Sequence, residues 1–283
     1  MSGRFWQVRG RRLSLTSPLI MGILNVTPDS FSDGGRHATV EDAVRHALQM
    51  AEEGADIIDV GGESTRPGAA PVEEAEELAR VIPVVTELAK RDLLISVDTS
   101  SPKVMREAVQ AGAHILNDVR SFTRPGALEV AAQTGAGVVI MHMKGDPKTM
   151  QQAADYEDVT AEVLAFLALQ DARLVAAGVN REAICWDPGL GFAKNVEHNF
   201  KLLADTEKLA SFGRPVLVGF SRKASIGAVT GVKNPEERVH GSVAAHLLAA
   251  LSGASVLRVH DVRATRNALD VLKAMQKAKA SGT

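Results

Sequence analysis

Polar side chains that could bind ligands or do chemistry recur in this chain at the ends of short apolar runs. The first such run, 19–24, stops at Asn25 and leads into the segment 27–37, which is rich in hydroxyl, carboxylate and glycine residues. A short apolar run of this kind is typical of a buried strand. The segment that follows is longer than a simple connection requires, so it predicts an active-site loop.

The same arrangement recurs along the rest of the chain. Seven further apolar runs have polar residues at or just after their C-terminal ends. These segments are DIIDVGGESTRPG (56–68), LLISVDTS (93–100), HILNDV (114–119), GVVIMHMKGDP (137–147), AICWDPGLGFAKN (183–195), PVLVGFSRKASIG (215–227) and SVLRVHDV (255–262). The sequence therefore predicts eight strands, each with polar residues at the same end.

Patterns of helical period separate these strands. The expected helices begin at Thr39, Pro71, Pro102, residue 155 and Asn234, where capping residues or prolines often precede apolar stripes. Strand–helix alternation with fully apolar strands predicts a parallel sheet. Eight such units in 283 residues favour an α/β fold of the closed (β/α)8 TIM-barrel type. The alternative is an open doubly wound sheet, whose nucleotide-binding form is disfavoured because no GxGxxG follows the first strand.

The whole chain, 1–283, is expected to form one barrel domain, since such barrels routinely use about 250 residues. Residues 1–18 are expected to form a hairpin that turns at Gly10 and closes the barrel where its first strand begins. The last residues, 277–283, are expected to be frayed. In a closed barrel all eight strand ends meet at one rim, so the polar residues become a single site.

Composition excludes several classes of protein. The chain has 32 Lys+Arg against 34 Asp+Glu, a formal net charge of -2, and so no excess charge for a nucleic-acid or membrane surface. No apolar stretch resembles a signal peptide or reaches membrane-spanning length, and we therefore expect a cytoplasmic protein. Cys185 is the only cysteine, which excludes an internal disulfide, and we expect it to be a buried small apolar residue.

Cationic side chains gather at the predicted rim. They follow strands two, seven and eight and are Arg66, Arg222, Lys223, Arg258 and His260. Arginine has a planar fork that matches phosphate oxygens, and barrels often bind phosphate near the ends of strands seven and eight. An isolated arginine is more often a surface ion-pair partner. Cations from three separate strand ends instead favour an anionic substrate or leaving group.

Carboxylate and amide side chains end three other strands: Asp98, Asn117 and Asp187. A buried carboxylate without a partner costs several kcal/mol, so each must meet a cation, a metal or a donor on a ligand. A heterocycle with an amino group beside a ring N–H would satisfy such a carboxylate with two hydrogen bonds. The alternative is a structural role, and for Asp98 it is equally plausible, because Asp98 or Ser101 could cap the next helix.

A metal ion is also compatible with the sequence. Asn25 and Asp33 offer hard oxygen atoms, with Asp29, Asp59 and Glu63 nearby. Such ligands and an anionic substrate suit Mg2+, which binds few protein groups and keeps waters and phosphate oxygens. A zinc site is disfavoured because there is no HExxH and no Cys/His cluster. His142 could be a ligand, but a lone histidine in an apolar strand is more often a satisfied core residue.

The chain resembles the dihydropteroate synthase family from about residue 19 to residue 275. The resemblance is carried, in the family's order, by GILNVTPDSFSDGG, DIIDVGGESTRPG, ISVDTS, NDV, MHMKGDPKTMQ, DPGLGFAKN, GFSRKASIG and RVHDV. It implies a pterin-binding (β/α)8 barrel that joins 6-hydroxymethyl-7,8-dihydropterin pyrophosphate to p-aminobenzoate. The products would be 7,8-dihydropteroate and pyrophosphate.

The resemblance also implies roles for residues that match the family's motifs. Asp187 would accept from the pterin 2-amino group and ring N–H, Asp98 and Asn117 would contact the other edge of the ring, and Lys223 would donate to its oxygen and nitrogen side. Asn25 and Asp33 would bind Mg2+ with pyrophosphate. The phosphates would be held by Thr65, Arg66, Arg258 and His260, and p-aminobenzoate would pack against Phe31, Pro67, Phe192 and Ser221. Arg222 belongs to the same motif without an assigned role.

The implied mechanism is SN1-like, with Asp98, Asp187, Lys223 and Arg258 as the catalytic residues. Departure of pyrophosphate would leave a carbocation on the pterin methylene, stabilised by the two carboxylates. No covalent enzyme intermediate is needed, in agreement with the absence of an obvious nucleophile–base pair. Loops 27–37 and 62–71 would close over the site and exclude water.

Three other functions remain possible from the sequence alone. A pterin-binding methyltransferase-type barrel would have no pyrophosphate to hold, which argues against it because Arg66 and Lys223 are present. A catalytically silent homologue would be expected to lose NVTPDSFSDGG or STRPG, and both are intact. A phosphosugar enzyme would have little use for the three acidic and amide residues. The family's habit implies a homodimer, although the apolar stripes of the last helices, Leu247, Leu248, Leu251, Leu269, Leu272 and Met275, could instead pack on the barrel.

Overall fold

The computed structural model describes residues 4–26, 35–63, 72–145 and 154–281, with the side chains of 35–39 excepted. Eight parallel strands form the centre of the molecule. They are β3 (Leu19–Asn25), β4 (Ile57–Gly61), β5 (Ile95–Asp98), β6 (Ile115–Asp118), β7 (Gly137–Met141), β8 (Ile184–Asp187), β9 (Leu217–Val218) and β10 (Val256–Val259). These strands are the eight apolar runs of the sequence, and their side chains are almost all buried because helices cover one face and the barrel interior the other.

The sheet closes into a barrel. Its order is β8-β7-β6-β5-β4-β3-β10-β9, and a parallel bridge between Trp186 and Val216 joins the two ends. At this closing bridge the Trp186 amide donates to Pro215 O at 2.9 Å. The predicted (β/α)8 TIM barrel is therefore confirmed, and the open doubly wound alternative is wrong.

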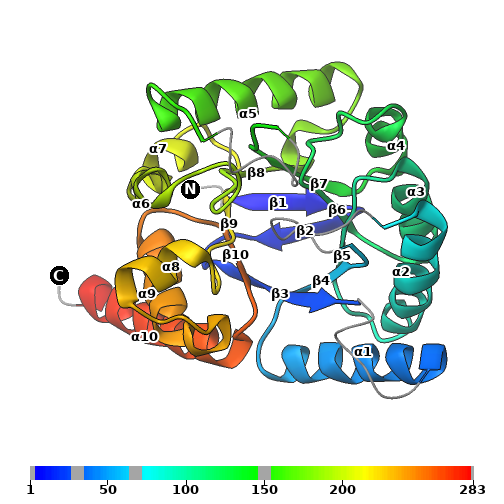
Figure 1. The fold of residues 1–283 in the computed structure, drawn as a ribbon, viewed down its shortest axis with the longest axis horizontal. Coiled ribbons are helices and arrows are strands. Elements are labelled where there is room, and N and C mark those ends of the chain that lie inside the picture. The colour runs from blue at the N-terminus through cyan, green and yellow to red at the C-terminus, as the bar shows by residue number, and fades with distance from the viewer. Residues whose placement is uncertain (1–3, 27–34, 64–71, 146–153, 282–283) are drawn as a thin grey trace.

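An outer layer of helices surrounds the strands (Figure 1). The helices are α1 (Gly35–Glu52), α2 (Glu74–Ala89), α3 (Pro102–Ala111), α4 (Ala127–Thr134), α5 (Val159–Ala176), α6 (Val196–Ala204), α7 (Thr206–Ala210), α8 (Ala224–Thr230), α9 (Val239–Leu251) and α10 (Val262–Ser281). Where helix starts were expected, Pro102 is the first residue of α3. By contrast, α1 begins at Gly35 rather than at Thr39, and Asn234 caps a short 3-10 turn, Pro235–Glu237, that precedes α9.

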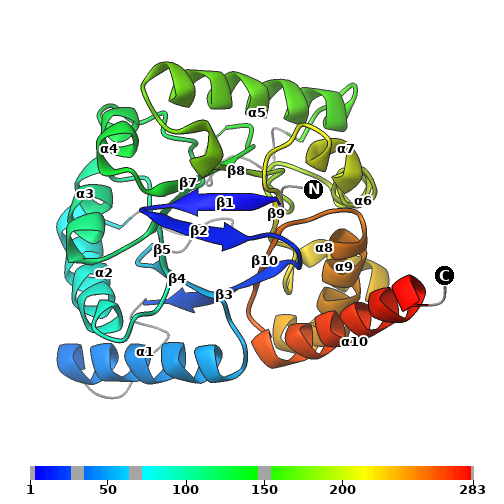
Figure 2. The same cartoon turned by 180° about the vertical axis from the view of Figure 1, so that it is seen from behind.

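The N-terminal hairpin consists of β1 (Phe5–Val8) and β2 (Arg11–Ser14). It lies across one end of the barrel (Figure 2), the end at which the strands begin. Trp6 is fully buried there, and its indole N–H donates to Ala183 O at 2.8 Å. Trp6 and Val8 complete an apolar cluster with residues inside the barrel: Met21, Ile57, Ile115, Val139, Cys185, Leu217 and Val256. The expected hairpin and the burial of Cys185 are confirmed.

The C-terminal helix α10 continues to Ser281, and its last described residues are exposed. The expected fraying of residues 277–283 stays a prediction. The sequence KAKA is rich in residues of high helix propensity, which favours continuation of the helix without tertiary contacts. In the part of the chain that the structure describes, no helix is both long enough and apolar enough to cross a membrane.

Candidate active site at the C-terminal ends of the strands

The register of the sheet places the polar strand ends side by side. Asn25 pairs with Gly61, Gly61 with Asp98, and Asp98 with Asn117 across β3, β4, β5 and β6. A β-carbon at Gly61 would lie 3.6 Å from the Asp98 Cβ and 3.9 Å from the Asn25 Oδ1. These are ordinary van der Waals distances, and they show that the Asn25 amide and the Asp98 side chain both lie close to Gly61.

An ion-pair network lies beneath this row and joins strands that are far apart in the sequence. The Arg258 guanidinium, from β10, donates from Nε to Asp59 Oδ2 at 2.6 Å and from Nη2 to Asp98 Oδ2 at 2.8 Å. Asn117 Nδ2 donates to the same Asp59 oxygen at 3.2 Å. One arginine therefore serves two buried carboxylates, which leaves this group of side chains with a deficit of positive charge.

Asp59 is the residue of this network that the sequence did not identify as part of the site, beyond its position near the proposed metal ligands. Its side chain is fully buried, and its second oxygen, Oδ1, has no hydrogen-bond partner among the described residues. The only signal in the sequence is a carboxylate inside the apolar run DIIDV, and such a residue requires a buried partner. That partner, Arg258, is 199 residues away along the chain.

Burial shifts the acidity of both candidate catalytic carboxylates in the same direction. It raises the pKa of Asp98 to about 7, an effect that Arg258 opposes and Asp59 reinforces. It raises the pKa of Asp187 to about 6, while the Gly189 amide and the Lys223 ammonium act in the opposite direction. Around neutral pH each carboxyl is therefore close to its pKa. A ligand that supplies N–H donors or positive charge would stabilise the ionised form of each group.

Asp98 does not cap the helix that follows β5. The residue that caps α3 is Ser101, whose Oγ accepts from the Val104 amide at 3.3 Å. Asp98 instead turns to Arg258 inside the barrel. Asp187 has a local role as well, since its Oδ1 accepts from the Gly189 amide at 2.7 Å and so fixes the turn that follows β8.

Lys223 and Phe192 meet on another side of the rim. The Lys223 ammonium lies 4.2 Å from the centroid of the Phe192 ring, a cation–π arrangement. A β-carbon at Gly191, whose φ is +84°, would lie 2.8 Å from the Lys223 Cδ. The lysine stem therefore packs along the glycine-containing loop after β8, and the ammonium is directed by an aromatic face.

Ser221 and His260 form a second pair at the ends of β9 and β10. The His260 amide donates to Ser221 Oγ at 3.1 Å, and His260 Nδ1 lies 3.0 Å from the same oxygen. Burial lowers the pKa of His260 to about 3, with Arg222 and Arg258 acting in the same direction. The sequence grouped His260 with the cations, but burial, reinforced by the neighbouring cations, favours the neutral imidazole.

Arg222 was expected among the anion-binding cations, but the structure places it in a structural ion pair. Its guanidinium donates to both oxygens of Asp261, from Nε at 3.0 Å and from Nη2 at 2.6 Å. Its backbone has φ +58°, and its amide donates to Ser242 Oγ at 2.8 Å. Arg222 thereby ties the loop that carries Ser221 and Lys223 to the loop that follows β10.

Five of the predicted site residues lie outside the described residues: Phe31, Asp33, Thr65, Arg66 and Pro67. Of the others, Arg222 is held by Asp261, and the rest lie with Asp59 at the ends of the strands or in the turns that follow them: Asn25, Asp98, Asn117, Asp187, Phe192, Ser221, Lys223, Arg258 and His260. Among the described residues no group of three or more His, Cys, Asp or Glu side chains could hold a metal ion. The hard oxygen of Asn25 beside Asp98 does fit Mg2+, which completes its shell with water and phosphate oxygens.

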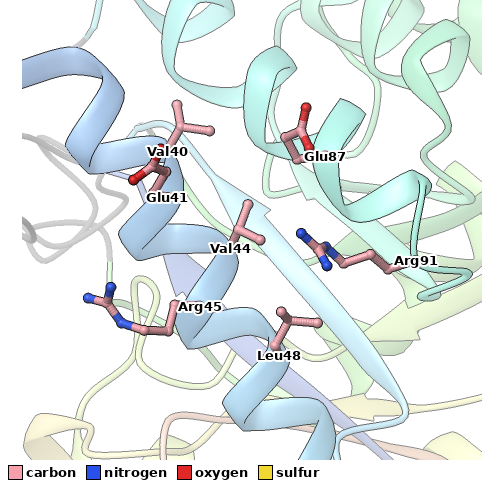
Figure 3. A pocket seen from close by; sticks show the side chains of 7 residues that line it. All are labelled: Val40, Glu41, Val44, Arg45, Leu48, Glu87 and Arg91. Atoms are coloured by element: carbon pink, nitrogen blue, oxygen red, sulfur yellow. The ribbon is translucent and has the colours of Figure 1, made fainter.

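A groove elsewhere on the surface contains none of these residues. It has a volume of about 540 Å³ and lies between α1 and α2 (Figure 3), lined by Val40, Glu41, Val44, Arg45, Leu48, Glu87 and Arg91. Its charged groups are of both signs and stand at its edges. The polar strand ends, rather than this groove, bring together the buried titratable groups that mark a functional site.

The barrel and its rim are those of a pterin-binding protein. The sequence profile described as "Pterin binding enzyme" matches residues 21–260. The chain is 54% identical over 272 residues to the dihydropteroate synthase of Escherichia coli strain K12, covering 96% of each protein. The chain belongs to the pterin-binding enzymes and, within them, to the dihydropteroate synthases.

Two solved structures of the Xanthomonas albilineans dihydropteroate synthase give the same result. The complex with 4-aminobenzoic acid has a TM-score of 0.92 at 52% identity and covers 97% of this chain and 99% of that one. The complex with 7,8-dihydropteroate has a TM-score of 0.88 at 50% identity and covers 96% and 98%. The similarity therefore extends over the whole barrel and is not restricted to the motifs at its rim.

Proposed function

We propose that this protein condenses 6-hydroxymethyl-7,8-dihydropterin pyrophosphate with p-aminobenzoate to give 7,8-dihydropteroate and pyrophosphate. The observation that carries the proposal is the set of buried polar side chains at the strand ends, Asp98, Asn117 and Asp187, and burial raises the pKa of both carboxyls. A pterin offers what they lack, namely N–H donors on a ring that becomes electron-poor during the reaction. The relatives crystallised with 4-aminobenzoic acid and with 7,8-dihydropteroate support the same substrates.

The proposed pterin contacts use side chains from four strands. Asp187 accepts from the 2-amino group and the ring N–H, while Asp98 and Asn117 address the other edge of the ring. Lys223, directed by Phe192, donates to the oxygen and nitrogen side. These four residues come from rigid strand ends or the turns after them, which favours a preformed pocket.

The chemical step that we propose is dissociative. The bond between the pterin methylene carbon and the pyrophosphate oxygen breaks, and both electrons leave with the oxygen. The resulting carbocation is delocalised into the ring, where the buried carboxylates of Asp98 and Asp187 stabilise it. The lone pair of the aromatic amine then forms the new C–N bond, and the nitrogen passes its proton to an oxygen of the released pyrophosphate.

The leaving group requires cations. Arg258 and, from outside the described residues, Thr65 and Arg66 are proposed to hold the phosphates, with His260 as a neutral hydrogen-bonding partner. A bound Mg2+ would neutralise charge on pyrophosphate, and Asn25 with Asp33 are the residues proposed to hold it. Ser221, Phe192, Phe31 and Pro67 are proposed to form the p-aminobenzoate wall.

Release of pyrophosphate by the purified protein tests this proposal. We expect release from dihydropterin pyrophosphate only when Mg2+ and p-aminobenzoate are both present, together with formation of dihydropteroate. Pterin binding without any release would favour the methyltransferase-type or silent alternative. Release that continues unchanged in D98N and D187N would contradict the proposed roles of the two carboxylates.

We also propose a homodimer through the last two helices. Leu269 and Leu272 are buried against the barrel. Three other residues of the apolar stripes are exposed: Leu248, Leu251 and Met275. Exposed apolar side chains on two adjoining helices favour self-association. Sedimentation of wild type and of L248E/L251E should give a dimer and a monomer respectively; equal masses would contradict this interface.

A single domain over 1–283 and a cytoplasmic location stay predictions.

A further inference from the structure

Lys194 is a buried lysine for which the proposed reaction has no use. It lies in the loop between β8 and α6, and only 3% of the residue is exposed. Four acceptor atoms surround its ammonium. They are the carbonyl oxygens of His142, Gly189 and Phe192, at 3.2, 3.0 and 2.9 Å, and the His142 Nδ1 at 3.0 Å.

Placing an ammonium in such a position is unfavourable unless its protons are all bonded. Burial lowers the pKa of Lys194 to about 7, while Asp187 acts in the opposite direction. His142 can accept because it is neutral: burial lowers its pKa to about 3, and its ring packs edge-on against Phe166 with centroids 5.0 Å apart. His142 is therefore a buried residue with its hydrogen bonds satisfied, rather than the metal ligand that the sequence also allowed.

The backbone of the loop is shaped around this ammonium. Gly189, Gly191 and Ala193 all have positive φ, of +69°, +84° and +49°, a conformation that an L-residue such as Ala193 adopts only at a cost. The turns direct the carbonyls of Gly189 and Phe192 inward to Lys194. The loop also lies so close to β7 that a β-carbon at Gly189 would be 2.0 Å from the His142 oxygen.

The positions of the Asp187 carboxylate and of the Lys223 ammonium both depend on this loop. The Gly189 amide fixes the Asp187 carboxylate, and the residues at 191 and 192 form the surface along which Lys223 lies. The Lys194 ammonium joins Gly189 and Phe192 to each other and to the end of β7. Without it, three buried carbonyls would lose their common donor, and the loop could relax away from the strand.

We propose that Lys194 is a positioning residue of the proposed reaction. Its ammonium acts as an internal cation that holds the loop 188–194 on β7, so that Asp187 faces the pterin and Phe192 directs Lys223. This inference rests on the proposed synthase function. Measurement of wild-type activity in the same assay tests that function separately.

The experiment compares K194A, K194M and K194Q with wild type, and with K208M as a matched control on the exposed surface of α7. We expect kcat/KM for dihydropterin pyrophosphate to fall by about 10- to 100-fold in K194A and K194M, because small displacements of positioned groups have effects of this size. K194Q keeps two donors and should be intermediate, and K208M should match wild type. Circular dichroism establishes which variants are folded.

Chemical rescue separates positioning by the ammonium from a general loss of structure. K194A lacks three methylenes and an ammonium, which n-propylammonium supplies, and we expect this ion to restore at least part of the activity. It should not act on K194M, whose side chain fills the space, and tetramethylammonium at equal ionic strength should not act on K194A, because it has no N–H donor.

Two results would overturn the inference. One is a folded K194A or K194M with kcat/KM within about twofold of wild type. The other is a loss of activity in K194A that n-propylammonium does not restore while K194Q is as inactive as K194M. An inactive wild type would instead refute the proposed function, so the two failures are distinguishable.

Discussion

At the scale of single residues, the buried carboxyls of Asp98 and Asp187 determine how the site responds to pH. Their pKa values of about 7 and 6 are both raised, primarily by burial. A raised pKa means that the folded protein holds a proton on each group at pH values where an exposed carboxyl is ionised. A protonated carboxyl presents an O–H donor on one oxygen, so it no longer accepts one N–H bond at each oxygen from an amino group and a ring N–H.

Pterin binding should therefore weaken as the pH falls below about 7. We expect the affinity for 6-hydroxymethyl-7,8-dihydropterin, which has no phosphate to titrate, to drop by about tenfold per pH unit once a proton must be displaced. Fluorescence titration between pH 8 and pH 5 measures this. D187N should bind weakly with a flatter profile, and a wild-type affinity that is constant over the range would contradict ionised carboxylates as the acceptors.

The same shift predicts an effect on stability in the absence of ligand. The folded pKa of Asp187 is raised from 3.8 to about 6, so its favourable contribution is complete below pH 3.8 and is lost as the pH rises through 6. At pH 8 the ionised carboxylate is destabilising by up to ~3 kcal/mol. D187N, inactive but still able to accept from Gly189, should be more stable than wild type in urea unfolding at pH 8.

This stabilisation should depend on pH. The advantage of D187N should shrink by about 1 kcal/mol at pH 5, where wild type recovers a proton on Asp187. An Asp-to-Asn change at an exposed acid provides the control, and D270N, on the exposed surface of α10, should lack this pH-dependent gain. If D187N is less stable than wild type at pH 8, burial is not the dominant influence on this residue.

Residues that end apolar strands could be placed from the sequence, whereas Asp59 inside the barrel and Lys194 in the loop after β8 could not. Asp98, Asn117 and Asp187 each end an apolar run, and closure of a barrel brings such ends together. Asp59 and Lys194 act through partners whose positions only the fold determines, namely Arg258 two strands away in the sheet and the carbonyls of three residues. The sequence gives their charge but does not show which atoms neutralise it.

At the scale of elements, the loops after β9 and β10 work as a unit because Arg222 and Asp261 join them. The sequence placed Arg222 in a motif without a role, since an arginine that binds a phosphate and one that binds a carboxylate look alike along the chain. Short elements were equally hidden. α8 covers only Ala224–Thr230, too few residues for a helical period to stand out.

Removal of the Arg222–Asp261 ion pair should reduce activity more than it reduces the stability of the barrel. We expect R222A to raise KM for both substrates and to lower stability by about 1–3 kcal/mol, because it leaves Asp261 largely buried and unpaired. Steady-state kinetics and thermal melting measure the two effects. The matched control is R45A, which removes a pair with Asp42 whose arginine is mostly exposed and should change neither. If R222A and R45A have the same KM values and the same melting temperature, the proposed role of the Arg222–Asp261 ion pair is contradicted.

At the scale of the whole molecule, the barrel separates stability from chemistry. The hairpin and the cluster around Trp6 close the end at which the strands begin, while the polar groups occupy the opposite end. The sequence could predict this division, because the apolar strands predict a barrel and the N-terminal segment precedes its first strand. It could not predict the indole bond to Ala183, which joins residues 177 positions apart.

The division predicts that changes at the closed end affect folding without altering the reaction. W6A removes a fully buried indole and should lower the free energy of unfolding by about 3–5 kcal/mol. W6F keeps most of the ring volume and loses mainly the bond to Ala183, so a smaller loss of about 1 kcal/mol, plus any packing defect, is expected. Urea unfolding gives both values. For protein that remains folded, kcat/KM should stay within about twofold of wild type, because a barrel's chemistry is confined to its other end. A large rise in KM in folded W6A would show instead that the hairpin influences the rim through the strands, and that the two ends are energetically coupled.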